Sequence, residues 1–193
     1  MNFEVLENFE WYNEPENVRF EDDAMLIYAN SGTDFIQKIY KGVKKDNGHF
    51  FFCRKNGDFD FILKWRFNEI KEATQCGVMV RVDERNWFKS AIEKTKSNSL
   101  NLFSSLSVLG RSDWTATYFD SDVDEIWFRV IRKNDEYEVF YSIDGKSFFK
   151  YKEFYLEKIE EVKIGAYMTS ADYESVVAEL SSIKMLDLWE SNS

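Results

Sequence analysis

Large apolar side chains alternate with polar ones along residues 59–67, and this alternation constrains the fold more than any other feature of the chain. The odd-numbered positions of the run are all large and apolar, namely Phe59, Phe61, Leu63, Trp65 and Phe67. The even-numbered positions are Asp60, Ile62, Lys64 and Arg66. Residues two apart share one face of a strand but lie on nearly opposite sides of a helix. The run therefore predicts a β-strand whose aromatic face packs in a core.

Similar short runs follow one another along the chain, separated by turn sequences rich in Asn, Asp and Gly. We predict strands at residues 25–29, 35–40, 49–54, 60–68, 77–82, 87–93, 100–109, 125–133, 137–143, 148–151, 162–169 and 176–188. Asn56-Gly57 is a strong hairpin signal between two of them. The only helical feature expected is one short turn within residues 154–160. The pattern predicts an all-β sandwich of two packed antiparallel sheets.

Length and composition favour one domain. The chain has 193 residues, of which 44% are hydrophobic, and this is enough for a large core. One proline and eight glycines leave no linker-like segment that would divide it. We therefore predict a single domain over residues 1–193.

The charge balance bears on possible partners. Thirty-five acidic residues against 25 basic ones give a formal net charge of −10. Such a surface repels phosphate backbones and anionic lipid headgroups, so we expect neither a nucleic-acid nor a membrane partner. A neutral ligand such as a saccharide is not hindered. The sequence leaves the oligomeric state open.

The two cysteines, Cys53 and Cys76, lie in apolar strand-like runs, which is typical of buried free thiols in a reducing compartment. The N-terminal residues lack the basic and apolar segments of a signal peptide, and no apolar stretch reaches membrane-spanning length. We expect a cytoplasmic protein. One histidine and two such thiols supply too few ligands for zinc, and no nucleotide or dinucleotide motif is present. No metal or cofactor is expected.

Two neighbouring strands carry the most chemical interest. Alternation places four residues on one face of the first strand, Gln75, Gly77, Met79 and Arg81. It places four more on one face of the second, Trp87, Lys89, Ala91 and Glu93. If the hairpin pairs the strands in simple register, these faces coincide. Planar polar groups beside an indole suit a sugar, whose hydroxyls are read in pairs while the ring C–H face stacks. The alternative is a solvated sheet face with ion pairs, which the alternation alone favours.

Evidence for catalysis is weak. His49 is the only histidine, and it follows the turn Asp46-Asn47-Gly48. It could act as a general base, although a hydrogen-bonding role at a strand start is commoner. No strand carries the paired carboxylates of a sandwich glycosidase, and a nucleophile elbow is absent.

Short motifs along residues 9–180 together resemble one family, the YesU-like, concanavalin A-like domains also called "regulation of enolase protein". The matching motifs are Trp11-Tyr12-Asn13-Glu14-Pro15, Thr33-Asp34-Phe35-Ile36-Gln37, Asp46-Asn47-Gly48-His49, Asp58-Phe59, Gln75-Cys76-Gly77-Val78-Met79-Val80-Arg81, Asn86-Trp87-Phe88-Lys89 with Glu93, Ser112-Asp113-Trp114, Ile126-Trp127-Phe128-Arg129-Val130, Ser142-Ile143-Asp144-Gly145 and Ile164-Gly165-Ala166-Tyr167. The resemblance implies a galectin-like jelly roll. It implies little about function, because the family is largely of unknown function. Some members look linked to plant cell-wall polysaccharide use, and a fungal member is named for an effect on enolase. Ile36 departs from the family, which tends to have tryptophan there, so a stacking platform is lost if that tryptophan binds ligand.

The resemblance also selects candidate ligand-binding residues, because polar and aromatic types recur there that a core does not require. The set is Trp11, Asn13, Glu14, Asp34, His49, Gln75, Arg81, Trp87, Lys89, Glu93 and Trp114. The first hypothesis is a saccharide-binding module in which the three tryptophans stack and the polar groups bind hydroxyls on a concave sheet. The second is a saccharide-processing enzyme with Glu93 or Glu14 as acid or base, assisted by His49. The third is an interaction protein that docks on a metabolic enzyme.

Overall fold

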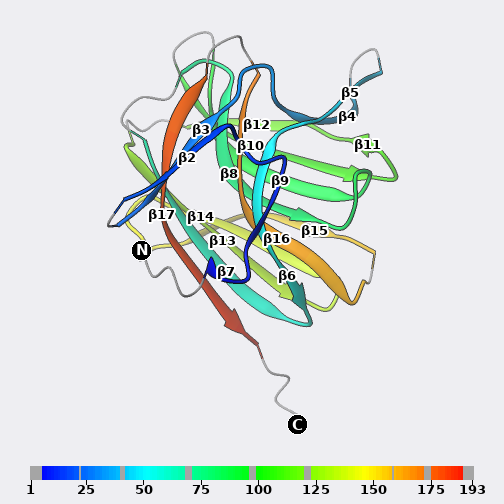
Figure 1. Cartoon of the computed structure of the whole chain (residues 1–193). Coiled ribbons are helices and arrows are strands. Elements are labelled where there is room, and N and C mark those ends of the chain that lie inside the picture. Colours follow the sequence, from blue (N-terminus) through cyan, green and yellow to red (C-terminus); the bar gives the residue numbers. More distant parts are fainter. Residues whose placement is uncertain are drawn as a thin grey trace.

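The computed structural model describes residues 6–21, 23–39, 42–67, 71–95, 99–119, 123–157, 159–171 and 175–188. Two large antiparallel sheets form a sandwich, as the alternation predicts (Figure 1). A two-stranded hairpin accompanies them. Among the described residues, no helix is long and apolar enough to cross a membrane.

Sheet A has eight strands. Seven follow in the order β1 (Glu10–Tyr12), β6 (His49–Asn56), β16 (Glu161–Ser170), β8 (Thr74–Arg81), β9 (Trp87–Lys94), β10 (Leu100–Val108) and β11 (Arg111–Ser112). The eighth, β12 (Thr115–Phe119), also pairs with β10.

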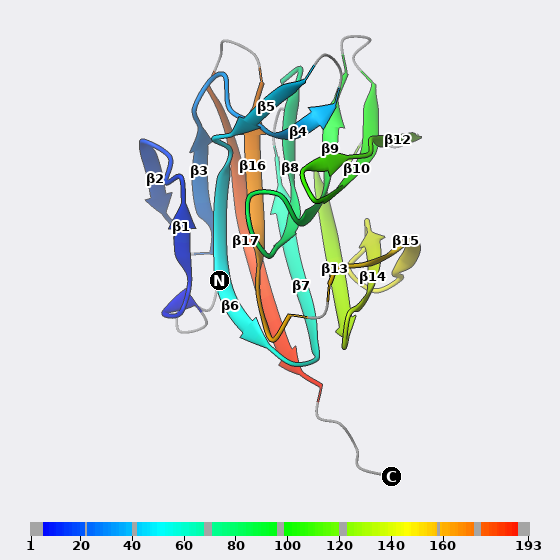
Figure 2. The same ribbon diagram turned by 90° about the vertical axis from the view of Figure 1, so that its right-hand side faces the viewer.

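Sheet B has seven strands. Their order is β15 (Phe149–Tyr155), β14 (Glu136–Ser142), β13 (Glu125–Lys133), β7 (Phe59–Arg66), β17 (Val176–Asp187), β3 (Met25–Ala29) and β2 (Asn17–Phe20). The hairpin consists of β4 (Phe35–Ile39) and β5 (Val43–Asp46). Figure 2 shows it lying across the strands of sheet A near one end of the sandwich.

The main core lies between the two sheets. The five apolar side chains of the 59–67 run belong to it, and none is more than 4% exposed. Trp65 donates a hydrogen bond from its indole nitrogen to the Gly77 carbonyl in sheet A at 3.0 Å. The aromatic face of this run therefore packs in the core, as the alternation predicts. The Trp65 hydrogen bond also joins the two sheets within the core.

Sheet A also buries apolar side chains on the face that points away from sheet B. The alternation of residues did not predict this second cluster. This second cluster comprises Phe35, Phe50, Phe52, Met79, Trp87, Ala91, Phe103 and Tyr167. Phe35 is the contribution of the hairpin, and it is 1% exposed. We call this surface the hairpin face of sheet A. Its aromatic content explains why strands such as β8 are buried along their whole length.

Several expectations about single elements need correction. The helical turn within 154–160 is wrong: β15 runs through Tyr155, and the described residues after it form no helix. Five short strands were missed, β1, β2, β5, β11 and β12, because two to five residues rarely show a clear period. Residues 40 and 68, expected at strand ends, lie outside the described part of the chain.

Both cysteines are buried and free, as predicted. Burial raises the pKa of the Cys53 thiol to about 11, and it raises the pKa of the Cys76 thiol by a larger amount. These thiols pack as small apolar groups and are poor nucleophiles.

The tight turn between β10 and β11 holds an exposed leucine in a strained conformation. Leu109 and Gly110 have φ values of 52° and 74°, as a two-residue hairpin turn requires. Leu109 is 65% exposed, so packing does not compensate for this backbone. We expect Leu109→Asn to raise the free energy of unfolding by about 1 kcal/mol, because Asn tolerates positive φ. Urea denaturation would measure this, with Leu109→Ala as the control that keeps the strain. An unchanged or lower stability of the Asn variant would refute the explanation.

Candidate functional site

The two strands of chemical interest pair in the simple register that the sequence predicts. Gln75 lies opposite Glu93, Met79 opposite Lys89, and Arg81 opposite Trp87. All six side chains therefore share the hairpin face. The solvated-face alternative is wrong for the three central polar residues, since Gln75, Arg81 and Lys89 are 3%, 2% and 0% exposed.

Lys89 is the centre of a buried polar network. Its ammonium group donates to Asp34 Oδ1 at 2.9 Å and to Gln75 Oε1 at 3.1 Å. It also lies 5.2 Å from the centre of the Phe103 ring and 5.6 Å from that of Tyr167. Asp34 precedes the hairpin, so this ion pair fastens the hairpin to sheet A. A buried charge of this kind is tolerated only because it is paired.

Gln75 connects the lysine to a carboxylate nearer the surface. Its Oε1 accepts from both Lys89 and the Tyr167 hydroxyl, so its amide nitrogen is left to donate to Glu93 Oε1 at 2.9 Å. Glu93 is partly exposed, and Gln75 is its only hydrogen-bond partner among the described residues. Burial raises the pKa of Glu93 above its ordinary value. The network thus ends at an oriented carboxylate.

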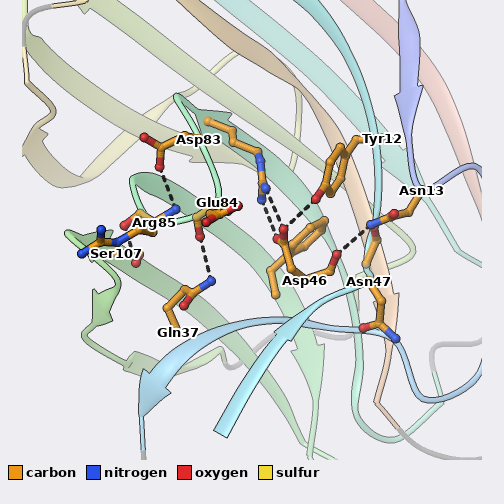
Figure 3. Close-up of polar contacts among 12 residues, drawn as sticks. Tyr12, Asn13, Gln37, Asp46, Asn47, Asp83, Glu84, Arg85 and Ser107 are labelled. Atoms are coloured by element: carbon orange, nitrogen blue, oxygen red, sulfur yellow. Dashed lines mark hydrogen bonds and ion pairs between the residues drawn. The ribbon is translucent and has the colours of Figure 1, made fainter. Parts of the chain in front are cut away.

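A second ion pair holds the other strand of the hairpin. Arg81 binds both oxygens of Asp46, at 2.7 and 2.9 Å, and its guanidinium lies 4.4 Å from the centre of the Tyr12 ring. The Tyr12 hydroxyl donates to Asp46 Oδ2 at 2.6 Å (Figure 3). Burial is the main cause that raises the pKa of Tyr12, and the bond to Asp46 adds to it. Tyr12 and Asp46 belong to motifs that match the family, but neither was among the predicted ligand-binding residues.

Exposed polar and aromatic groups adjoin the carboxylate end of the network. Asn101 of β10 lies opposite Glu93 on one side and Tyr118 of β12 on the other. One row further along, Trp114 packs on Phe103 with ring centres 4.2 Å apart. Trp114 is 42% exposed and Tyr118 65% exposed. We call Glu93, Asn101, Trp114 and Tyr118 the margin of the hairpin face.

The structure separates the three tryptophans that were predicted to stack on a ligand. Trp114 lies at the margin. Trp87 is 1% exposed, so its ring has no free face in this conformation. Trp11 packs on Phe51, against the main core and not on the hairpin face. Only Trp114 is placed to stack.

Three buried polar atoms around Trp87 have no hydrogen-bond partner among the residues that the structure describes. They are Trp87 Nε1, Gln37 Oε1 and Ser112 Oγ. Ser112 pairs with Ser107, which lies opposite Trp87 in β9. Gln37 belongs to β4, which packs against β11, and its amide donates to the Glu84 carbonyl at 2.7 Å (Figure 3). One indole donor, one amide acceptor and one hydroxyl beneath the hairpin are thus unpaired within the described part of the chain.

The remaining predicted residues lie at the N-terminal edge of sheet A, apart from the Lys89 network. Asn13 donates to the Asp46 and Gly48 carbonyls. Glu14 is exposed and forms no hydrogen bond or ion pair with any described residue. His49 begins β6, and β16 and β8 separate that strand from β9, so about 14 Å of sheet lies between His49 and Glu93. The structure therefore keeps Glu93 apart from His49, and Glu14, the alternative acid or base, forms no hydrogen bond with His49 among the described residues.

Both ring nitrogens of His49 are used by the backbone. Its Nε2 accepts from the Asn30 amide at 2.9 Å, so the ring proton lies on Nδ1, which donates to the Asn13 carbonyl at 2.6 Å. Burial lowers its pKa below 6.5. The histidine therefore stays neutral and holds two segments together, the commoner of the two roles considered for it.

His49 makes stability depend on pH. Because its pKa in the folded state is below 6.5, the unfolded chain takes up this proton more readily. We expect its contribution to be complete above pH 6.5 and to decline as the pH falls from there toward the folded-state pKa. Urea denaturation of the wild type and His49→Gln at pH 7.5, 6.5 and 5.5 would measure this. The variant should lose less stability on acidification, and parallel pH profiles would contradict the assignment.

No group of three or more His, Cys, Asp or Glu residues in the described part of the chain is arranged to hold a metal ion. The chemistry available at the margin is hydrogen bonding, carboxylate charge and aromatic stacking.

Comparison with known proteins agrees with this fold. "Regulation of enolase protein 1" of Saccharomyces cerevisiae is 26% identical over 137 residues, which cover 71% of this chain and 68% of that protein. A solved structure of a functionally unknown protein from S. cerevisiae matches with a TM-score of 0.88 at 22% identity and covers 95% of this chain and 98% of that one.

More distant structures share the fold. The GH43 protein BlXynB from Bacillus licheniformis (the K247S mutant) matches with a TM-score of 0.74 at 9% identity, over 94% of this chain but 37% of that one. The carbohydrate-binding module CBM66 from Bacillus subtilis matches with a TM-score of 0.58 at 9% identity, over 92% and 95% of the two chains. A family model described as "Protein of unknown function (DUF1349)" matches residues 11–187. The chain belongs to this family.

Proposed function

We propose that this protein binds a neutral saccharide at the margin of the hairpin face. The observation that carries the proposal is the placement of the Glu93 carboxylate and Asn101 amide one row from the exposed Trp114 indole. Side chains two residues apart on a strand are separated by about 7 Å, which is the scale of one sugar ring. An indole covers the C–H face of such a ring, while a carboxylate and an amide bind its hydroxyls.

The buried network supports the same proposal. Stability alone does not require Lys89, Asp34 and Gln75 in this position, because apolar residues of similar volume usually serve a core as well or better. Their arrangement fixes the amide of Gln75 and, through it, one oxygen of Glu93. A hydrogen-bonding group that is already oriented loses less freedom when a ligand binds.

Two structures that share the fold support a saccharide as the ligand class. One similar structure is a carbohydrate-binding module and another is a GH43 protein. We infer further that the sandwich is a concanavalin A-like, YesU-like jelly roll comprising a single domain. We also propose that the protein acts in the cytoplasm.

Isothermal titration calorimetry with xylotetraose, cellotetraose and fructose oligomers tests the proposal. We expect binding of at least one sugar at or below millimolar concentration, and a loss of tenfold or more in affinity in Trp114→Ala and Glu93→Ala. Tyr155→Ala is the matched control, because Tyr155 is 66% exposed on β15, away from the margin. The absence of binding at millimolar sugar, or equal affinity in all variants, would sink the proposal.

A second candidate function, docking on a metabolic enzyme, is favoured by Leu109. An exposed leucine retained in a strained turn is typical of a contact residue. The yeast relative is named for regulation of enolase. Size-exclusion chromatography with purified enolase would test this: Leu109→Asp should abolish a complex that Leu186→Asp, a change at the equally exposed Leu186, leaves intact. If the wild type forms no complex, this candidate fails.

A further inference from the structure

Two adjoining hollows lie on the outer face of sheet B, on the opposite side of the sandwich from the hairpin. One has a volume of about 340 Å³ and the other about 430 Å³. Tyr28 and Ser175 line both, so the hollows form one groove. Tyr28 is at its centre, on β3, between Asn17 of β2 and Val177 of β17. Volumes of this size are usual for small-ligand sites.

The first hollow is lined by polar groups, several of which have no hydrogen-bond partner in the described part of the chain. Among the described residues, no hydrogen bond is formed by the side chains of Asn17, Ser31 and Ser175 or by the Tyr28 hydroxyl. The Asn30 side-chain oxygen accepts from the Glu16 amide at 3.2 Å, and its NH₂ group forms no hydrogen bond with any described residue. The hollow therefore offers amide donors, an amide acceptor and three hydroxyls around one aromatic ring.

The second hollow is more apolar and carries a compensated charge. Leu26 and Val177 line it, and Val177 is 40% exposed. Arg66 binds Asp23 at 2.6 Å and lies 3.6 Å from Glu179, so its charge is balanced by two carboxylates. Its buried Nε has no hydrogen-bond acceptor. Lys71 also lines this hollow, so its apolar floor is bordered by charged side chains of both signs.

We propose that this groove is a second binding site, for a neutral oligosaccharide that packs on Tyr28 beside Arg19, whose guanidinium lies 5.3 Å from the centre of the Tyr28 ring. Free hydroxyl and amide groups beside a tyrosine ring match the hydroxyls and C–H faces of sugars. The charges along the groove balance, because Arg19, Arg66 and Lys71 are matched in number by Glu16, Asp23 and Glu179. A neutral ligand is therefore favoured over an anionic one in a chain whose net charge is −10. The groove is built on sheet B, so this site does not depend on the margin of the hairpin face.

Titration of ¹⁵N-labelled protein with xylotetraose and cellotetraose, followed by NMR, tests the groove directly. We expect chemical-shift changes at residues 17, 28, 31, 175 and 177 that saturate with sugar. By calorimetry, Tyr28→Ala should lower affinity at this site tenfold or more, and Tyr28→Phe only a few-fold because the ring remains. Tyr155→Ala and Trp114→Ala should leave the groove shifts unchanged, with folding of each variant checked by its melting temperature.

The outcomes separate the two sites. Shifts confined to residues 93, 101, 114 and 118 would overturn the groove proposal while supporting the margin of the hairpin face. Saturating shifts confined to the groove support the groove and count against the margin. No shift at either site at 10 mM sugar overturns the groove.

Discussion

Lys89→Met lowers the free energy of unfolding by about 3–5 kcal/mol, the usual cost of removing one partner of a buried ion pair. The lysine is fully buried, and its loss leaves the Asp34 carboxylate, 7% exposed, without its cation. It also removes one of the two donors to Gln75 Oε1. Because Asp34 precedes β4, the hairpin should loosen as well. Urea denaturation at pH 7 measures the effect.

Two further variants show whether the loss comes from the unpaired charge. Asp34→Asn combined with Lys89→Met should cost less than the sum of the two single changes, because neither charge is then left alone. Lys150→Met is the matched control: Lys150 pairs with Glu138 at the surface, where an ion pair contributes about 1 kcal/mol or less. If Lys89→Met and Lys150→Met lower the free energy of unfolding equally, the buried ion pair contributes no more to stability than a surface pair.

Trp65→Ala lowers the free energy of unfolding by about 3–5 kcal/mol, as large-to-small changes of core aromatics do. Trp65 is 0% exposed in the middle of β7, so the lost volume cannot be filled from solvent. The indole also donates to the Gly77 carbonyl of the facing sheet. Chemical denaturation of the purified variant provides the measurement.

Trp65→Phe separates packing from hydrogen bonding. It keeps most of the apolar volume but removes the indole donor to the Gly77 carbonyl, and a net loss of about 1 kcal/mol is usual for one hydrogen bond. Trp114→Ala, at an exposed tryptophan of the same chain, should cost much less. If Trp65→Ala and Trp114→Ala destabilise equally, the core assignment of the 59–67 run is in error.

Much of the fold was predictable because a strand sorts its side chains by a local rule. The alternation in β7 predicted the buried face, and the paired faces of β8 and β9 followed from the turn between them. The short strands β1 and β12 were not predictable, since their pairing with β6 and β10 comes from the sheet and not from their own sequence. The helical turn at 154–160 was wrong because its apolar residues serve β15 and the core.

The candidate site was predicted only in part. Gln75, Lys89 and Glu93 do form one network, and Asp34 joins it from 55 residues before Lys89. Trp87 and Trp11 were wrongly expected to present free rings, because one lies beneath the hairpin and the other packs on the main core. Asn101 and Tyr118 carried no sequence signal, and they adjoin Glu93 only through strand register.

The amino-acid sequence alone was enough to predict the longer strands, the buried face of β7 and the coincidence of the polar faces of β8 and β9, because these depend on neighbours within one strand or hairpin. Only the tertiary structure shows which polar side chains on these strands are exposed to solvent. The 59–67 run lies in the core as its alternation requires, but the hairpin face is buried because a distant hairpin places Phe35, Asp34 and Asp46 on it. That contact joins segments far apart in the chain. The alternation within a strand shows which side chains point away from the main core. Whether those side chains are buried depends on other segments of the chain that pack on that face.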